Sequence, residues 1–132
     1  MPDKVQFSLV SPERLLMSGD VDMVVVPGTD GDFGVLPGHA PVISTIRMGV
    51  IEVHDGSHVE RMFISSGVCE VSANRCTVLA DEAVPVAGLE RAELEQRLKD
   101  AEEDLTEAKA DDEAYAAAEK IARLKGMLDA LQ

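Results

Sequence analysis

Tryptophan is absent from this 132-residue chain, and aromatic residues of all kinds make up only 3% of it. Surfaces that stack sugars or single-stranded nucleic acid are built from aromatic side chains, so neither ligand fits this composition. Basic residues are also scarce, with 12 Lys and Arg against 25 Asp and Glu and a formal net charge of -13. Because like charges repel, the composition argues against nucleic acid and anionic membrane surfaces as direct partners.

Long hydrophobic runs are missing as well. No apolar segment approaches the length of about 20 residues that a membrane-spanning helix needs. The first residues, MPDKVQF, lack the apolar core of a signal peptide. We therefore expect a cytoplasmic protein that associates with a membrane only through a partner.

Cysteine is rare, and the two that occur, Cys69 and Cys76, lie close together within a predicted hairpin. One interpretation is a redox pair. The interpretation we favour is two small, buried, apolar side chains in a reducing compartment, where disulfides are rare. No metal site is expected, because His54 and His58 flank a turn in which solvated side chains are the favoured interpretation.

Residues 4–83 show the period of two that is typical of half-buried strands. Val5, Phe7 and Leu9 alternate with polar neighbours. The turn signals Asp55-Gly56 and Ala73-Asn74 each separate two short β-like segments. Many short strands joined in this way predict an all-β sandwich.

After Pro85 the period changes to that of a helix. One apolar stripe with steps of three and four falls on Leu94, Leu98, Ala101, Leu105 and Ala108. A second stripe falls on Ala118, Ile121, Leu124, Leu128 and Leu131. A short acidic segment separates the stripes, and we expect Asp111 or Asp112 to cap the second helix. Two helices with one narrow stripe each predict an antiparallel hairpin.

The fold class that follows is α+β in two parts, an N-terminal all-β sandwich followed by a C-terminal antiparallel α-helical hairpin. We place the sandwich domain at residues 1–86 and the helical hairpin domain at residues 87–132. The boundary falls where Pro85 and Gly88 interrupt both periodic patterns. Because a two-helix hairpin buries little surface, we expect part of its stability to come from docking on the sandwich or on another protein, which makes it a candidate moving part.

The segment VPGTDGDFGVLPGHAP, from Val26 to Pro41, combines several Gly and Pro residues and predicts one shaped loop. It carries Asp30, Asp32 and His39 but no nucleophile beside a base. The acids fit solvated turn residues, and the histidine fits a structural role within the loop. A hydrolase site formed by these three side chains is the alternative, and it needs a cleft between them.

This segment resembles the signature loop of the epsilon subunit of bacterial F-type ATP synthases, the counterpart of the mitochondrial delta subunit. Further segments agree in order: FSLVSPERLLMSGD near the start, ISSGVCEVSANRCTVLADEA in the middle and the helical hairpin at the end. The resemblance covers essentially the whole chain, and it implies that the sandwich is flattened.

The resemblance implies a non-catalytic rotor subunit of the central stalk, without a cofactor. Such a subunit links the gamma subunit to the c-subunit ring and couples proton flow to ATP synthesis, peripherally at the cytoplasmic face of the bacterial inner membrane. The residues implied to face the c ring are Thr29, Asp30, Gly31, Asp32 and Phe33. The residues implied to face the gamma subunit are His39, Ala40 and Pro41.

In the same family the hairpin can contact the alpha and beta subunits and inhibit ATP hydrolysis through basic residues. The cations that cluster for this role are Lys120, Arg123 and Lys125. The first helix is rich in acids and opposes docking on an acidic partner, so the inhibition is expected to be weak. The alternative is a solvated helix surface whose charges pair along the helix.

Some family members bind ATP at the start of the first helix, which makes an ATP-sensing regulatory module the alternative function. This chain has Glu90 and Arg91 there. The acid is Glu in place of Asp, and the Arg-Ala pair comes two residues early, which rotates the guanidinium by about 200° around the helix. The departure from the family pattern argues against ATP binding at this site.

Overall fold

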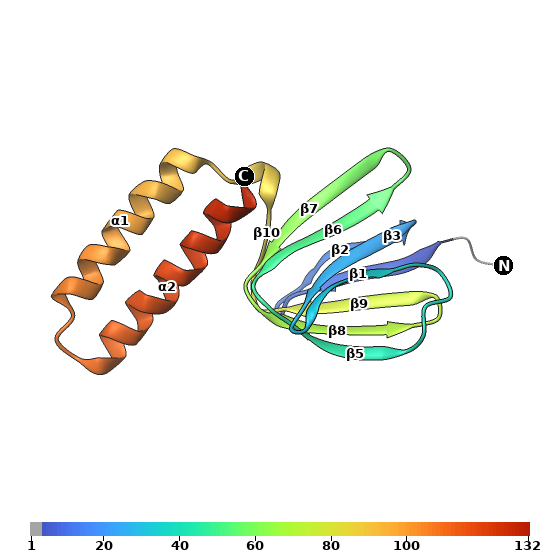
Figure 1. The fold of residues 1–132 in the computed structure, drawn as a ribbon, viewed down its shortest axis with the longest axis horizontal. Helices are drawn as coiled ribbons and strands as arrows, with labels where there is room; N and C mark the ends of the chain where they lie inside the picture. The colour runs from blue at the N-terminus through green and yellow to red at the C-terminus, as the bar shows by residue number, and fades with distance from the viewer. Residues whose placement is uncertain (1–3) are drawn as a thin grey trace. The chain divides into compact units, whose positions relative to one another are not determined.

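The computed structural model describes residues 4–132. The chain divides into two compact units, the first ending at Pro85 and the second spanning Val86–Gln132. The first unit is built from strands and the second from helices (Figure 1). The strands are β1 (Val5–Val10), β2 (Leu15–Val21), β3 (Met23–Gly28), β4 (Gly31–Val35), β5 (Val42–Ile46), β6 (Gly49–Asp55), β7 (His58–Ile64), β8 (Gly67–Ser72), β9 (Arg75–Ala80) and β10 (Ala83–Pro85).

The strands pair in the order β10-β7-β6-β3-β5-β8-β9-β1-β2, and β4 pairs with β3. β1 and β9 run parallel, whereas the hairpin partners run antiparallel. β3 meets β5 at the pair Gly28–Ile46, where the sheet passes from one layer to the other. One layer holds β4, β3, β6, β7 and β10, and the other holds β5, β8, β9, β1 and β2. The predicted all-β sandwich is confirmed.

The core lies between the inner faces of these layers, because alternate residues of each strand point inward. The predicted alternation on β1 is confirmed, since Val5, Phe7 and Leu9 are at most 1% exposed.

Cys69 and Cys76 are free, fully buried thiols whose Sγ atoms lie 3.7 Å apart. The neighbouring Cys69 thiol and burial both raise the pKa of Cys76, which keeps that side chain neutral. Their predicted role as small buried side chains fits this environment.

Both predicted β-hairpins are confirmed. β6 and β7 pair up to Asp55–His58, and Gly56 in their turn has a φ of 63°, which favours glycine. β8 and β9 pair up to Ser72–Arg75 around the predicted turn.

The second unit contains a short 3₁₀ helix η1 (Val86–Gly88), α1 (Arg91–Glu107) and α2 (Asp111–Ala130). α1 and α2 lie side by side, as the two apolar stripes predict (Figure 1). Leu94 and Ala101 of the first predicted stripe are buried, whereas Leu105 is 38% exposed. The second predicted stripe is wrong in part, because Ala118 is exposed and the buried residues of α2 are Ala117, Leu124, Met127 and Ala130. Three of these four lie one position before a predicted stripe residue, which turns the buried face by about 100° around the helix. None of the helices within residues 4–132 is long and apolar enough to cross a membrane.

The predicted cap of the second helix is wrong. Ala110 occupies the N-cap position with extended angles (φ -120°, ψ 152°), and no side chain caps it. Asp111 and Asp112 instead lie in the first turn of α2. Carboxylates there are stabilised by the positive end of the helix dipole, which removes the advantage of using either acid as the cap.

Candidate interaction surfaces

The Gly-rich segment is largely a β-hairpin rather than a free loop. β3 and β4 pair from Val24–Val35 to Gly28–Gly31, and only Thr29 and Asp30 lie between the strands. The expectation of a single shaped loop is therefore wrong for residues 26–35. Pro27 lies within β3 although it has no N–H to donate. Its carbonyl still accepts a hydrogen bond, from the Arg47 N–H at 2.9 Å.

Two glycines are required by the shape of this turn. A Cβ atom on Gly28 would lie 2.8 Å from the Gly31 carbonyl oxygen and 2.9 Å from Cε1 of Phe33. Gly31 has a φ of 134°, which other residues rarely adopt. The aromatic ring therefore packs closely against bare backbone, and the turn is compact.

The turn also contacts β5, a strand that follows the β3–β4 hairpin in the sequence and is not part of it. The Thr29 N–H and hydroxyl both donate to the Thr45 carbonyl, at 3.1 and 2.7 Å. The guanidinium of Arg47 donates from Nη2 to Oδ1 of Asp32 at 2.6 Å. These contacts connect both ends of the turn to β5 and to the residue that follows it.

The structure brings His39 to the same place. A surface hollow of about 420 Å³ is lined by Gly28, Asp30, Gly31, Asp32, Phe33, His39, Val42 and Ser44. Nδ1–H of His39 donates to the Ala40 carbonyl at 2.7 Å, and the Gly38 N–H donates to the Ala73 carbonyl at 2.6 Å. Ala40 and Pro41 are exposed beside it. One residue implied to face gamma therefore shares a surface with those implied to face the ring.

This hollow does not favour the hydrolase alternative. Asp32 is held in an ion pair with Arg47, and the ring of His39 is oriented by a backbone carbonyl. An acid–base pair needs a histidine directed at the reacting group, with its second nitrogen positioned by an acid. Within residues 4–132 no group of three or more His, Cys, Asp or Glu side chains is arranged to hold a metal ion.

A second surface lies on the outer face of the other layer, where the strand register aligns apolar residues across four strands. Val68 on β8 is opposite Leu79 on β9, Leu79 is beside Val10 on β1, and Val10 is opposite Leu15 on β2. We call these four residues the apolar row. Val68, Leu79 and Leu15 are 40%, 50% and 58% exposed. The alternating pattern placed these strands but did not single out Val10, Val68 or Leu79.

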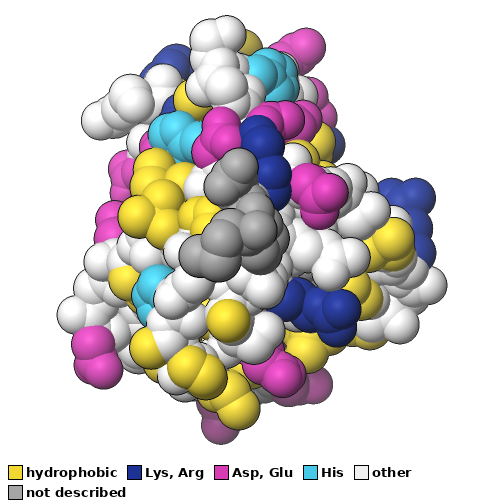
Figure 2. Space-filling model, turned by 90° about the vertical axis from the view of Figure 1, so that its right-hand side faces the viewer, with side chains coloured by type: hydrophobic (Ala, Val, Ile, Leu, Met, Phe, Trp, Pro, Cys, Tyr) yellow, Lys and Arg dark blue, Asp and Glu magenta, His cyan; other side chains and the backbone are white. Residues whose placement is uncertain are grey.

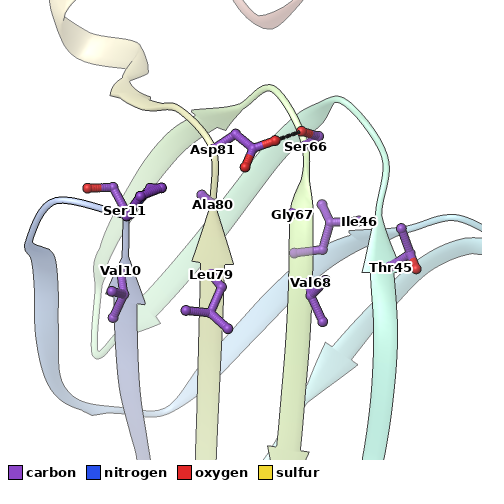
Figure 3. A pocket seen from close by; sticks show the side chains of 11 residues that line it. Val10, Ser11, Thr45, Ile46, Ser66, Gly67, Val68, Leu79, Ala80 and Asp81 are labelled. Carbon is purple, nitrogen blue, oxygen red and sulfur yellow. Dashed lines mark hydrogen bonds between the residues drawn. The ribbon is translucent and has the colours of Figure 1, made fainter.

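The end of the apolar row borders a hollow of about 380 Å³. Figure 3 shows Val10, Leu79 and Val68 side by side on three neighbouring strands, with Thr45 and Ile46 beyond them. At the rim, the Ser66 hydroxyl donates to Oδ2 of Asp81 at 2.6 Å. The surface is therefore mostly apolar, with a paired serine and aspartate at its edge.

The excess negative charge is not concentrated in one patch of the face seen in Figure 2. Acidic side chains (magenta) are scattered there among hydrophobic and uncharged atoms.

The three cations predicted to inhibit hydrolysis do not form one patch. At about 100° per residue, Lys120 and Arg123 are about 60° apart on α2, whereas Lys120 and Lys125 are about 140° apart. Lys120 lines a hollow of the hairpin together with the acids Asp104, Glu107 and Glu113. Arg123 is half-buried and has an interaction partner of its own. Of the three cations, Lys120 is the one that the structure places in a hollow lined by acids of the hairpin.

The residues implied for ATP binding lie at the start of the hairpin. Glu90 is the N-cap of α1 and makes no side-chain cap hydrogen bond, and Arg91 is the first residue of the helix. Both are exposed. Their geometry is that of an ordinary helix start.

Known proteins resemble this chain along its whole length. Residues 4–86 match the family model described as ATP synthase, Delta/Epsilon chain, beta-sandwich domain. The ATP synthase epsilon chain of Maricaulis maris is 50% identical over 96% of both chains, and that of Parvibaculum lavamentivorans is 48% identical over 95% of this chain and 96% of its own.

A solved structure shares the fold. A chain in the cryo-EM structure of the Euglena gracilis mitochondrial ATP synthase, OSCP/F1/c-ring in rotational state 1, superposes with a TM-score of 0.84 at 20% identity. The match covers 100% of this chain and 84% of that one. With the family model spanning the sandwich and the relatives spanning both units, the chain belongs to the ATP synthase epsilon family, whose members are non-catalytic subunits of the synthase.

Proposed function

We propose that this chain joins the gamma subunit to the c-subunit ring in the central stalk of a proton-translocating ATP synthase, and so couples proton flow to ATP synthesis. It acts peripherally, at the cytoplasmic face of the bacterial inner membrane. The observation that carries the proposal is the apolar row, which exposes side chains of four neighbouring strands. An exposed apolar face of this kind is typical of a surface that a protein partner covers.

The apolar row and the β3–β4 turn are proposed to bind different partners. Covering the apolar row stabilises the complex with gamma, by about 1.5–3 kcal/mol for each large aliphatic side chain that is buried. His39, Ala40 and Pro41 are proposed to form a separate contact with gamma, since His39 lines the hollow beside the β3–β4 turn and not the apolar row. The β3–β4 turn, with Thr29, Asp30, Gly31, Asp32 and Phe33, projects toward the ring as a compact element tied to β5. Transmission of torque needs such a rigid connection, because a flexible one would yield under load.

Reversing the charge of the turn tests this function. Asp30→Lys combined with Asp32→Lys should leave the isolated subunit folded, because changes at exposed turn positions alter stability by only about 0.5 kcal/mol each. In membranes it should weaken attachment of the catalytic head and lower ATP-driven proton pumping. Attachment should weaken by about tenfold, since losing an attractive contact and adding a repulsive one changes binding by roughly 1.4 kcal/mol.

The control is Glu13→Lys combined with Asp20→Lys, which makes the same change in net charge at two exposed positions outside the turn. The control should retain normal pumping. Normal coupling in washed membranes of the turn variant would contradict a ring-facing role for the turn.

We further propose that the helical hairpin contacts the alpha and beta subunits and restrains ATP hydrolysis only weakly. Removal of residues 89–132 should raise hydrolysis by the assembled enzyme less than about tenfold, because exposed ion pairs contribute roughly 0.2–1 kcal/mol each. Replacing Lys120, Arg123 and Lys125 by Ala should reproduce most of that rise. A rise of several orders of magnitude on truncation, with no effect of the Ala variant, would point to an apolar contact instead.

A further inference from the structure

Arg47 contacts both strands of the β3–β4 hairpin, although it lies outside that hairpin in the sequence. Its backbone N–H donates to the Pro27 carbonyl at 2.9 Å. Its side chain donates from Nη1 to the Gly28 carbonyl at 3.4 Å and from Nη2 to Oδ1 of Asp32 at 2.6 Å. A single residue therefore bridges the end of one strand and the beginning of the next, on either side of the two-residue turn.

The two acids of the turn, which look equivalent in the sequence, differ in the structure. The Asp32 carboxylate is engaged by the guanidinium of Arg47. Asp30 is exposed at the tip of the turn, and within residues 4–132 its carboxylate makes no hydrogen bond or ion pair. Asp30 is therefore the acid of the turn whose carboxylate is not already paired with a cation among the described residues.

We propose that Arg47 is a positioning residue for this turn, and that Asp30 rather than Asp32 is the carboxylate the turn presents to a cationic group on the c-subunit ring. The inference rests on the proposed function, because it assigns separate roles to residues of the proposed ring contact. Arg47 satisfies Asp32 and fixes the backbone at Gly28, and Asp30 is thereby held outward on a defined turn.

Arginine suits this role better than lysine would. Its planar guanidinium directs N–H groups toward two acceptors at once, here a carboxylate and a backbone carbonyl. The Arg47 and Asp32 side chains are 46% and 60% exposed, so their pairing contributes little to the stability of the whole sandwich. Its effect should fall on the local order of the turn.

The test measures two quantities in the full chain. The first is amide hydrogen exchange of residues 29–33 in the isolated subunit, and the second is the number of protons pumped per ATP hydrolysed after assembly. Arg47→Ala and Asp32→Asn should each speed exchange about two- to fivefold, the range expected for an exposed ion pair. The double variant should exchange no faster than Arg47→Ala alone, because Arg47→Ala already removes the contact with Asp32 together with the contact to Gly28. Arg47→Lys should fall between Arg47→Ala and the parent chain.

Asp30→Asn should leave exchange unchanged and lower the pumping ratio more than Asp32→Asn does. The control is Arg97→Ala, which breaks an ion pair of similar exposure with Glu93 on α1. It should change neither the exchange of the turn nor the pumping ratio.

The outcomes separate the inference from the proposed function. Unchanged exchange in Arg47→Ala would overturn the positioning role. A larger pumping defect in Asp32→Asn than in Asp30→Asn would overturn the assignment of the presented acid. Faster exchange in Arg47→Ala, together with normal pumping in every variant, would confirm the positioning role and contradict the proposed ring contact itself.

Discussion

Replacing Gly67 by alanine is expected to lower the free energy of unfolding of the sandwich by about 3 kcal/mol, the upper range for overpacking a core. A Cβ atom at this position would lie 2.2 Å from the carbonyl oxygen of Leu79 and 3.1 Å from Cα of Ala80. Both neighbours are backbone atoms of β9, so no side-chain rotation relieves the clash. β8 and β9 must separate, and they carry the buried residues Cys69 and Val78.

Urea or thermal unfolding of the isolated subunit measures this effect. For a domain of this size, each kcal/mol shifts the melting temperature by about 4–8 °C. The matched control is Gly19→Ala on β2, where an added Cβ atom meets nothing within 4 Å. The control should change stability by less than about 0.5 kcal/mol. If the Gly67→Ala and Gly19→Ala variants unfold at the same urea concentration or temperature, then β8 and β9 do not approach each other closely enough at Gly67 to exclude a Cβ atom.

The second large effect is expected on assembly rather than on folding. Leu79→Glu should weaken binding of this chain to the gamma subunit by about 100-fold, because the interface loses a buried aliphatic side chain and must desolvate a carboxylate. The isolated sandwich should remain folded, since Leu79 is 50% exposed and substitutions at such strand positions span about 1 kcal/mol.

Binding of the purified subunits, measured by titration, checks this prediction. The matched control is Val59→Glu, which introduces the same charge at a residue that is 44% exposed on β7 and lies outside the apolar row. Val59→Glu should bind normally. Undiminished binding by Leu79→Glu would mean that gamma docks on another face, and that the apolar row needs a different explanation.

Much of the fold was predictable from local patterns, but β4 was not, because its Gly-rich sequence shows no apolar alternation and its pairing with β3 makes it a strand. Val5, Phe7 and Leu9 repeat with the period of a strand and are buried, and the turn around Gly56 has the positive φ that the Asp55-Gly56 signal predicts. These patterns depend on residues close together in the chain, so they are visible without knowing how strands pair. The capping residue of α2 was not predictable, because several adjacent acids could serve either as cap or in the first turn.

The surfaces depended on contacts between distant residues. The members of the apolar row come from β1, β2, β8 and β9, and only the register of the ladder aligns them. Arg47 and Asp32 are 15 positions apart, and their pairing follows from β5 lying beside the turn at Gly28–Ile46.

The order of residues along the chain was enough to identify a sandwich, a helical hairpin, the family and the turn carrying Asp30 and Asp32. The hydrophobic period and the positions of glycine reflect the local backbone conformation, so they can be recognised without knowing which strands pair. The exposure of the apolar row and the different contacts of the two acids emerged only from the folded chain. Both are set by strand order and register, which place side chains from separate segments within a few ångströms of one another.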